Sequence, residues 1–155
     1  MDTQLIIKEL KKYFDVRELV SKSVWERMGE NAWLLFDPRL LEVLLVLRRD
    51  VLCVPLVCNN WAKGGTMQQR GLRENVCPMV AEKTRAGKMY LSEHTMGRAV
   101  DLSAIGKTAD EMRDLIKQQA SRLPHNIRVE DGESAPTWLH VDVRDTGQKV
   151  YFFKA

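Results

Sequence analysis

The sequence predicts an α+β domain in which helices pack on one face of a mostly antiparallel sheet. Apolar residues recur at helical spacing through about residues 1–50, and short segments of strict apolar and polar alternation occur later in the chain. A chain of 155 residues is long enough to bury a core without disulfide support. We therefore expect one domain over residues 1–155, with a helical part at about 1–50 and a sheet-bearing part at about 51–155.

Three helices are expected in the first part of the chain. The first two cover residues 3–13 and 15–28, the second capped by Asp15 and ended by Gly29. The third starts at Pro38. It is expected to end near residues 48–50. One face of this helix carries an apolar stripe that should pack on the sheet: Leu40, Leu41, Val43, Leu44 and Leu47.

The second part alternates between regular and irregular segments. Residues 54–57 are expected to begin the sheet, and residues 59–75 form a Gly-rich loop. Residues 76–90 are poorly periodic, so we expect a flexible segment that gates a cleft. A fourth helix is expected over about residues 109–122, and residues 149–153 are expected to form a last strand.

The segment SEHTMGRAVDL (residues 92–102) places a histidine near an aspartate. Gly97 stands between His94 and Asp101, where it allows the sharp turn that brings two side chains to one point. After the turn, alternation predicts a short strand in which Val100 and Leu102 share one face. Asp101 therefore points to the opposite face.

The segment PTWLHVDVR (residues 136–144) shows the same pattern. Its apolar Leu139, Val141 and Val143 share one face of a predicted strand. His140 and Asp142 therefore share the other face.

A hairpin should join this second segment to an upstream strand. Residues 127–129 alternate in the same way, and Asp131-Gly132 begins the connecting loop. If both strands turn their apolar residues to one core, Glu130 lies on the same face as His140, within about 7 to 8 Å even as a diagonal neighbour. Glu130 is therefore a candidate general base.

Three of these side chains form a set that suits a metal ion. A catalytic zinc takes three protein ligands and leaves a fourth position to water, whose pKa falls to about 7. His94, Asp101 and His140 supply such ligands. The remaining histidine, His125, stands alone in a loop-like stretch and is expected to be an ordinary surface or core residue.

The chain resembles the zinc D-Ala-D-Ala carboxypeptidase and L-alanyl-D-glutamate endopeptidase family, whose fold is shared by the hedgehog signalling domain. The nearest branch is the small phage or prophage type, and the resemblance covers almost the whole chain. Besides the two histidine segments it includes Phe-x-x-x-Glu-Leu at residues 14–19, Asn-Asn-Trp and Gly-Gly at residues 59–65, and Arg-Gly-Leu-Arg at residues 70–73.

The resemblance implies one Zn²⁺ ion on His94, Asp101 and His140, in a cleft on the sheet face away from the helices. It also implies hydrolysis of peptide bonds in the stem peptides or cross-links of bacterial peptidoglycan by a metal-activated water. Carboxypeptidase and endopeptidase activity, and D,D- and L,D-type bonds, remain open.

Arg73 matches the family's arginine that precedes the first metal histidine and reaches into the cleft. Amide hydrolysis builds negative charge on the carbonyl oxygen, which a fixed guanidinium stabilises, or the same group holds a substrate carboxylate. Arg70 is the less favoured candidate for this role.

The general base departs from the family pattern. Many relatives carry an acidic residue three positions before the last metal histidine, and here that position is Thr137. Glu130 and Glu133 are the two substitutes. Strand parity favours Glu130, because a strand fixes a side chain better than a loop does.

Neighbouring side chains have simpler expected roles. Asp142 should orient a metal ligand or form a surface hydrogen bond, and Trp138 should cover the edge of the core or line the substrate cleft. Ser92 is expected to be a turn or second-shell hydroxyl, and Glu93 a solvated neighbour.

Composition excludes several other classes. A net charge of +3 from 24 basic and 21 acidic residues, without a recognised motif, is no nucleic-acid signature. No Gly-x-Ser-x-Gly motif supports a serine hydrolase. No segment has the length of a signal peptide or membrane span, so we expect no membrane insertion. We expect a monomer.

Three cysteines, Cys53, Cys58 and Cys77, cannot all pair and lack Cys-x-x-Cys spacing. We expect Cys53 and Cys58 to be buried reduced thiols, as in a protein made in the cytoplasm. Action on the cell wall then requires release as a lysis protein or transport on a phage particle. The alternative is a non-catalytic phage structural or binding protein that keeps the fold and the zinc site.

Overall fold

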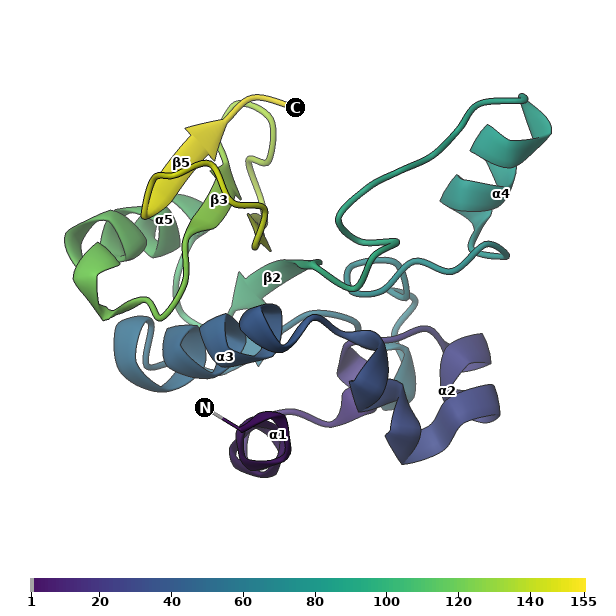
Figure 1. Ribbon diagram of the computed structural model, residues 1–155, viewed down its shortest axis with the longest axis horizontal. Helices are drawn as coiled ribbons and strands as arrows, with labels where there is room; N and C mark the ends of the chain where they lie inside the picture. Colours follow the sequence, from purple (N-terminus) through teal and green to yellow (C-terminus); the bar gives the residue numbers. More distant parts are fainter. Residues whose placement is uncertain (1) are drawn as a thin grey trace.

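The computed structural model describes residues 2–155 and has α+β architecture, with five α-helices and a five-stranded sheet in those residues (Figure 1). Short 3₁₀ segments and one π-helical turn connect the elements. The helices and strands have these bounds: α1 Thr3–Leu10, α2 Lys22–Met28, α3 Pro38–Val46, β1 Leu56–Val57, α4 Pro78–Arg85, β2 Ala99–Ala104, α5 Ala109–Gln118, β3 Ile127–Glu130, β4 Leu139–Asp142 and β5 Val150–Phe153.

The sheet is mixed, with strand order β1-β2-β4-β3-β5. Three of its four pairings are antiparallel, which agrees with the expected mostly antiparallel sheet, and the β3–β5 pairing is parallel. β3 and β4 form the expected antiparallel hairpin, in which Val129 lies opposite Val141. The central position of β4 between β2 and β3 brings both histidine segments together.

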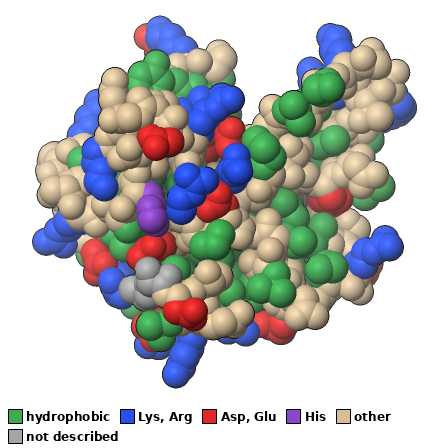
Figure 2. Space-filling view, in the orientation of Figure 1, with side chains coloured by type: hydrophobic (Ala, Val, Ile, Leu, Met, Phe, Trp, Pro, Cys, Tyr) green, Lys and Arg blue, Asp and Glu red, His purple; other side chains and the backbone are tan. Residues whose placement is uncertain are grey.

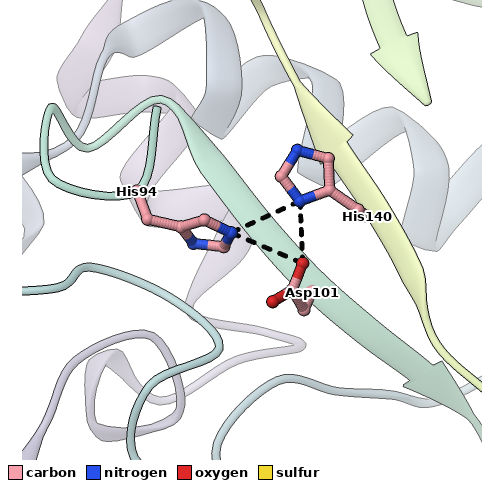
Figure 3. A group of neighbouring side chains, drawn as sticks. All are labelled: His94, Asp101 and His140. Atoms are coloured by element: carbon pink, nitrogen blue, oxygen red, sulfur yellow. Dashed lines mark hydrogen bonds and ion pairs between the residues drawn. The ribbon is translucent and has the colours of Figure 1, made fainter. Parts of the chain in front are cut away.

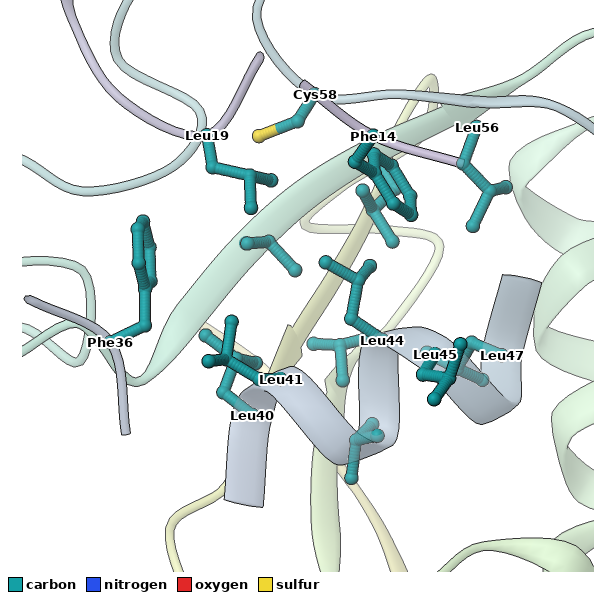
Figure 4. Close-up of a cluster of buried hydrophobic side chains, with 14 of the residues drawn as sticks. Phe14, Leu19, Phe36, Leu40, Leu41, Leu44, Leu45, Leu47, Leu56 and Cys58 are labelled. Carbon is teal, nitrogen blue, oxygen red and sulfur yellow. The ribbon is translucent and has the colours of Figure 1, made fainter. Parts of the chain in front are cut away.

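The two faces of the sheet differ in polarity, as the alternation predicted. The face that packs on α3 carries Val100, Leu102, Val129, Leu139 and Val141, all buried in the main hydrophobic cluster. All five residues of the predicted α3 stripe are buried there, beside side chains from the N-terminal segments and β1 (Figure 4). Asp101, His140 and Asp142 occupy the opposite face.

The prediction of one helix over residues 15–28 is wrong. Asp15 caps a short 3₁₀ segment, Val16–Glu18, and Ser21 then starts α2. Between them, the Val20 carbonyl accepts hydrogen bonds from Asn59 Nδ2 at 3.2 Å and Trp61 Nε1 at 2.8 Å. The chain leaves the helix because its carbonyls serve the loop after β1. Gly29 ends α2 with φ of 54°, as predicted.

Other elements differ from the expected bounds. α1 ends at Leu10 and α5 gives way to a 3₁₀ segment, Ala120–Arg122, so both α-helices are shorter than expected. α3 continues into a π-helical turn over Leu47–Val51, which ends close to the expected end near residues 48–50. The predicted strand at residues 54–57 is reduced to Leu56–Val57. Cys58 is buried, but Cys53 is exposed, which contradicts the expectation that both are buried.

Residues 76–90, where we expected a flexible segment, contain the helix α4. This helix and the segments on either side of it, residues 76–90, form an arm that stands apart from the rest of the molecule (Figure 1). Its only buried residue is Val80, so it has no apolar stripe from which a helix is recognised in sequence. Pro78 at its first turn is the signal that indicates it.

Candidate metal centre

His94 lies in the turn that precedes β2. Gly97 has φ of 66°, and its backbone approaches Leu35 so closely that a Cβ there would lie 2.1 Å from the Leu35 carbonyl oxygen. Only glycine fits both conditions. The turn buries the His94 ring, whose Nδ1 lies 2.8 Å from the Gly71 carbonyl oxygen. A carbonyl can only accept, so Nδ1 carries the proton and Nε2 is free to bind a cation.

Asp101 and His140 come from neighbouring strands. They are directly opposed in the antiparallel β2–β4 register, which brings side chains of one face to about 4.5 to 5.5 Å at Cβ. His140 thus reaches the same point as His94, although the two residues are 46 positions apart in the chain.

The three side chains converge on one position (Figure 3). His94 Nε2 lies 3.3 Å from His140 Nδ1 and 3.4 Å from Asp101 Oδ1, and His140 Nδ1 lies 2.8 Å from Asp101 Oδ1. Ligand atoms about 2.0 to 2.1 Å from a tetrahedral zinc lie roughly 3.3 to 3.4 Å apart. Two of the three separations have this value, and the third needs a shift of about half an ångström by that measure. The triad is therefore a possible metal site.

The His140 ring is held from both sides. Its Nε2 lies 3.1 Å from Asp142 Oδ2, and Asp142 is completely buried. Burial alone lowers the pKa of His140, but hydrogen bonds to Asp101 and Asp142, with their charges, outweigh it and raise the pKa to about 9. Without a metal ion the ring thus carries both protons at neutral pH. Binding of a cation at Nδ1 must displace one of them.

Asp101 stays ionised across the physiological range. Burial acts to raise the pKa of its carboxyl, but hydrogen bonds from His140 and His94, with their charges, hold the pKa well below the usual range. Arg73 adds an ion pair from Nη2 to Asp101 Oδ2 at 3.3 Å. One oxygen of Asp101 therefore faces the metal position and the other faces the guanidinium.

Arg73 is fixed by three partners. Besides Asp101, it donates from Nε to the Gln69 carbonyl oxygen at 2.8 Å and from Nη1 to Tyr90 Oη at 2.8 Å. Tyr90 belongs to the segment that returns from α4, so this contact ties the arm to the site. The guanidinium lines the cleft as expected and is held rigidly beside the triad.

A cleft of about 470 Å³ opens over the triad. In Figure 2 the surface is hollowed beside the arm that carries α4, and charged side chains of both signs gather on the wall opposite. The residues that line it come from the returning segment of the arm and from the polar sheet face: Arg73, Leu91, Ser92, Glu93, His94, Met96, Asp101, Arg128, Glu130, Trp138, His140, Asp142, Arg144, Phe153 and Ala155.

The two candidate bases lie in different environments. Glu130, at the end of β3, lines the cleft and is 9% exposed. The β3–β4 register that pairs Arg128 with Asp142 places Glu130 opposite His140. Glu133 lies outside the cleft lining, with its side chain 79% exposed and paired with Lys154. Of the two candidate bases, Glu130 therefore lies in the cleft over the triad and Glu133 lies outside its lining.

Of the remaining predicted residues, some line the cleft and others lie outside it. Trp138 lines the cleft, while Arg70 turns away from it and donates to Ser103 Oγ at 3.0 Å. Arg70 still contributes through its carbonyl, which accepts from the Asp101 amide at 2.7 Å. His125 lies outside the cleft lining, and its Nε2 is 2.9 Å from Glu42 Oε2.

Sequence reasoning gave no role in the cleft to Glu93, Arg128 or Phe153, all of which line it. Glu93 is buried rather than solvated, with Arg144 Nε 3.6 Å from its Oε1. Arg128 and Phe153 project onto the polar face from β3 and β5. Strand parity was the signal for Arg128, because it is two residues before Glu130; no signal pointed to Phe153, whose strand pairs in parallel with β3.

Comparisons with models of protein families, with curated proteins and with solved structures found no match. Within residues 2–155, no helix combines the length and apolar character needed to cross a membrane.

Proposed function

We propose that this protein is a zinc-dependent peptidase that hydrolyses peptide bonds in bacterial cell-wall peptides. One observation carries the proposal: two histidine nitrogens and a carboxylate oxygen lie within 4.8 Å of one another in a cleft that is also lined by the carboxylate side chain of Glu130. Two nitrogens and one oxygen are a ligand set that zinc takes in hydrolases. The substrate class rests on the family resemblance of the sequence motifs.

Zinc bound at this triad would supply Lewis-acid polarisation of the scissile carbonyl and a water activated at neutral pH. The triad is suited to it because each histidine has its second nitrogen engaged, by the Gly71 carbonyl and by Asp142. Each ring therefore offers one defined nitrogen to the metal position.

Glu130 is the proposed general base and acid. Its place opposite His140 on the cleft face supports this role, because opposed residues on one face of a strand pair lie about 4.5 to 5.5 Å apart at Cβ. In the proposed reaction it accepts a proton from the attacking water and then donates that proton to the leaving amine. Its partial burial keeps bulk water from competing for these transfers.

Arg73 is the proposed electrostatic partner of the substrate. Its guanidinium is held by the Gln69 carbonyl, Tyr90 and Asp101, so it needs no reorganisation when charge develops. It steadies the carbonyl oxygen during attack or binds a substrate carboxylate. Arg144, with its side chain 62% exposed at the rim, supplies a second cation for a peptide that carries carboxylates.

Incubation of the purified protein with bacterial peptidoglycan tests the proposal. Released fragments are identified by mass spectrometry with and without a chelator, and zinc is added back to the chelated sample. We expect chelation to abolish release, zinc to restore it, and His94→Ala and His140→Ala proteins to release nothing. The masses of the fragments identify the bond that is cleaved.

Failure to release any fragment at any zinc content contradicts the enzymatic proposal. If the same protein still binds zinc and peptidoglycan, the non-catalytic phage structural or binding protein takes its place. The sequence feature in favour of that outcome is Thr137, which stands where many relatives carry the acidic residue.

A further inference from the structure

We infer that Arg128 is a positioning residue of the metal site, which holds His140 in its metal-binding orientation through Asp142. The inference rests on the proposed metal site and concerns how that site is built. Arg128 has no place in the sequence motifs and does not contact the triad position through a charged atom. Its effect on the site passes through one carboxylate.

The contacts form an unbroken chain from Arg128 to the metal position. Arg128 donates from Nε to Asp142 Oδ1 at 2.9 Å and from Nη2 to Asp142 Oδ2 at 2.9 Å. Asp142 Oδ2 lies 3.1 Å from His140 Nε2. His140 Nδ1, on the other side of the ring, faces Asp101 and His94. Each link is a direct contact between charged or polar atoms.

Asp142 depends on this arginine because it is fully buried. Besides the Arg128 guanidinium and the His140 ring, its side chain accepts one hydrogen bond, from the Arg144 amide to Oδ1 at 3.0 Å. A buried carboxylate that loses its cation is strongly destabilised. Removal of Arg128 therefore leaves the carboxylate held by the Arg144 amide at Oδ1 alone, so Oδ2, the acceptor that defines the His140 tautomer, is less firmly fixed beside the ring.

The fold holds Arg128 in place on three sides. It is directly opposite Asp142 in the β3–β4 register and opposite Tyr151 in the parallel β3–β5 register. Its guanidinium carbon lies 4.5 Å from the centre of the Phe153 ring, and the same ring lies 5.8 Å, edge to face, from the His140 ring. Phe153 thus covers both the arginine and the histidine that it positions.

The competing explanation is that Arg128 only joins β3 to β4. That role predicts lower stability and unchanged zinc affinity of the folded protein. A positioning role predicts weaker zinc binding at a temperature where the variant is fully folded. The two explanations therefore differ in a quantity that does not depend on catalysis.

Zinc affinity measured by competition with a chromophoric chelator tests the inference on Arg128→Gln, Arg128→Lys and the unmodified protein. Substitution of a residue that holds a metal ligand in place typically costs about 10 to 100-fold in metal affinity, and we expect Arg128→Gln to lie in that range. Arg128→Lys should lose less, because an ammonium keeps the charge but cannot bond both carboxylate oxygens in a fork.

Arg17→Gln is the matched control. Arg17 makes the same two-pronged contact, to Asp15 at 2.9 and 2.6 Å, and lies 5.5 Å from the Trp25 ring, but it does not line the cleft. We expect Arg17→Gln to leave zinc affinity unchanged. In ¹⁵N spectra of the zinc-loaded unmodified protein, His140 should carry its proton on Nε2, and this signal should broaden or shift in Arg128→Gln only.

Folded Arg128→Gln that binds zinc within about twofold of the unmodified protein overturns the inference while the proposed function stands. An unmodified protein that binds no zinc at the triad overturns both. If Arg128→Gln does not fold, the conservative Arg128→Lys and Asp142→Asn, which removes the charged acceptor from the other end of the contact, make the same test. Unchanged affinity in both of them contradicts the positioning role.

Discussion

At the scale of single residues, each triad histidine is specified by the partner of its other nitrogen. The Gly71 carbonyl fixes His94 and the Asp142 carboxylate fixes His140, at 2.8 and 3.1 Å. These partners leave one nitrogen of each ring directed at the same position, and on His140 that nitrogen must lose its proton before it binds a cation. Three predictions belong to this scale, one on the base and two on the His140 proton that competes with the metal.

Glu130→Gln should lower kcat/KM for peptidoglycan hydrolysis by about 10² to 10⁴-fold, the usual contribution of a positioned proton-transfer group. Zinc content should be unchanged, because Glu130 is not part of the triad. Glu133→Gln is the matched control and should keep full activity, since its side chain is exposed and outside the cleft lining. Full turnover of zinc-loaded Glu130→Gln contradicts the assignment.

Zinc affinity should rise with pH. The pKa of His140 in the metal-free protein is about 9, above its ordinary value of 6.5, so below pH 9 a proton on His140 must leave before zinc binds. One competing proton predicts a gain of roughly tenfold in affinity per pH unit between pH 6 and 8. Asp101 adds no slope there, because its pKa is held far below this range. Chelator competition across this range measures it, and a flat profile contradicts it.

The raised pKa of His140 also makes the stability of the metal-free protein fall with rising pH, whereas zinc affinity rises. A pKa that is raised in the folded state stabilises the fold fully below 6.5, and this contribution is lost as pH rises through about 9. The contribution of His140 should therefore make the zinc-free protein unfold at a lower denaturant concentration at pH 9.5 than at pH 6.5. Removing the ring in His140→Ala should remove that part of the difference.

At the scale of elements, the antiparallel β2–β4 and β3–β4 pairings and one glycine turn build the site. The pairings place Asp101 and Glu130 on either side of His140, and the turn at Gly97 delivers His94 to the same face. Gly97 also joins the turn to the start of α3, because its carbonyl accepts from the Asp37 amide at 2.9 Å. The turn is therefore a point of contact between the helical part and the sheet.

Gly97→Ala should both destabilise the fold and weaken zinc binding. The added Cβ lies 2.1 Å from the Leu35 carbonyl oxygen, and the residue has φ of 66°. Gly106→Ala is the control, since Gly106 has φ of 83° but nothing within 4 Å of the added Cβ. We expect about 1 to 2 kcal/mol of lost stability for Gly106→Ala from the left-handed backbone alone, and a larger loss for Gly97→Ala in denaturant unfolding. Equal losses contradict the close-approach argument.

At the scale of the whole molecule, one hydrophobic cluster joins the helical part to the sheet. Side chains of α1, α3 and α5 meet those of β2, β3 and β4 within it, and Figure 4 shows the part of the cluster around α3. The polar cleft lies on the other face of the same strands. Stability of the core and geometry of the site are therefore linked through strands that serve both.

Leu41→Ala should cost about 2 to 5 kcal/mol of unfolding free energy, because Leu41 is fully buried in this cluster. Helix content followed by circular dichroism and the imidazole signals of His94 and His140 should disappear in one transition. Leu5→Ala, at an exposed position of α1, should change stability by less than about 0.5 kcal/mol. Two separate transitions in Leu41→Ala would contradict a single cooperative unit.

Local periodicity and strand parity were sufficient for several features of the fold and the site. They predicted the buried stripe of α3, the β3–β4 hairpin, and a common face for Glu130, His140 and Asp142, because side-chain direction alternates along a strand whatever lies next to it. The Gly97 turn was also predicted from sequence. These are properties of neighbours along the chain.

Tertiary structure alone decided the rest. The break between Val16–Glu18 and α2 follows from carbonyls that bond the loop after β1, and α4 has too few buried residues to show a period. The exposed position of Glu133 outside the cleft lining, the buried position of Glu93, and the contact of Arg128 with Asp142 follow from strand register and packing. Sequence determined which face each strand residue takes, and the pairing of distant strands decided which of those residues meet, because register depends on the whole core.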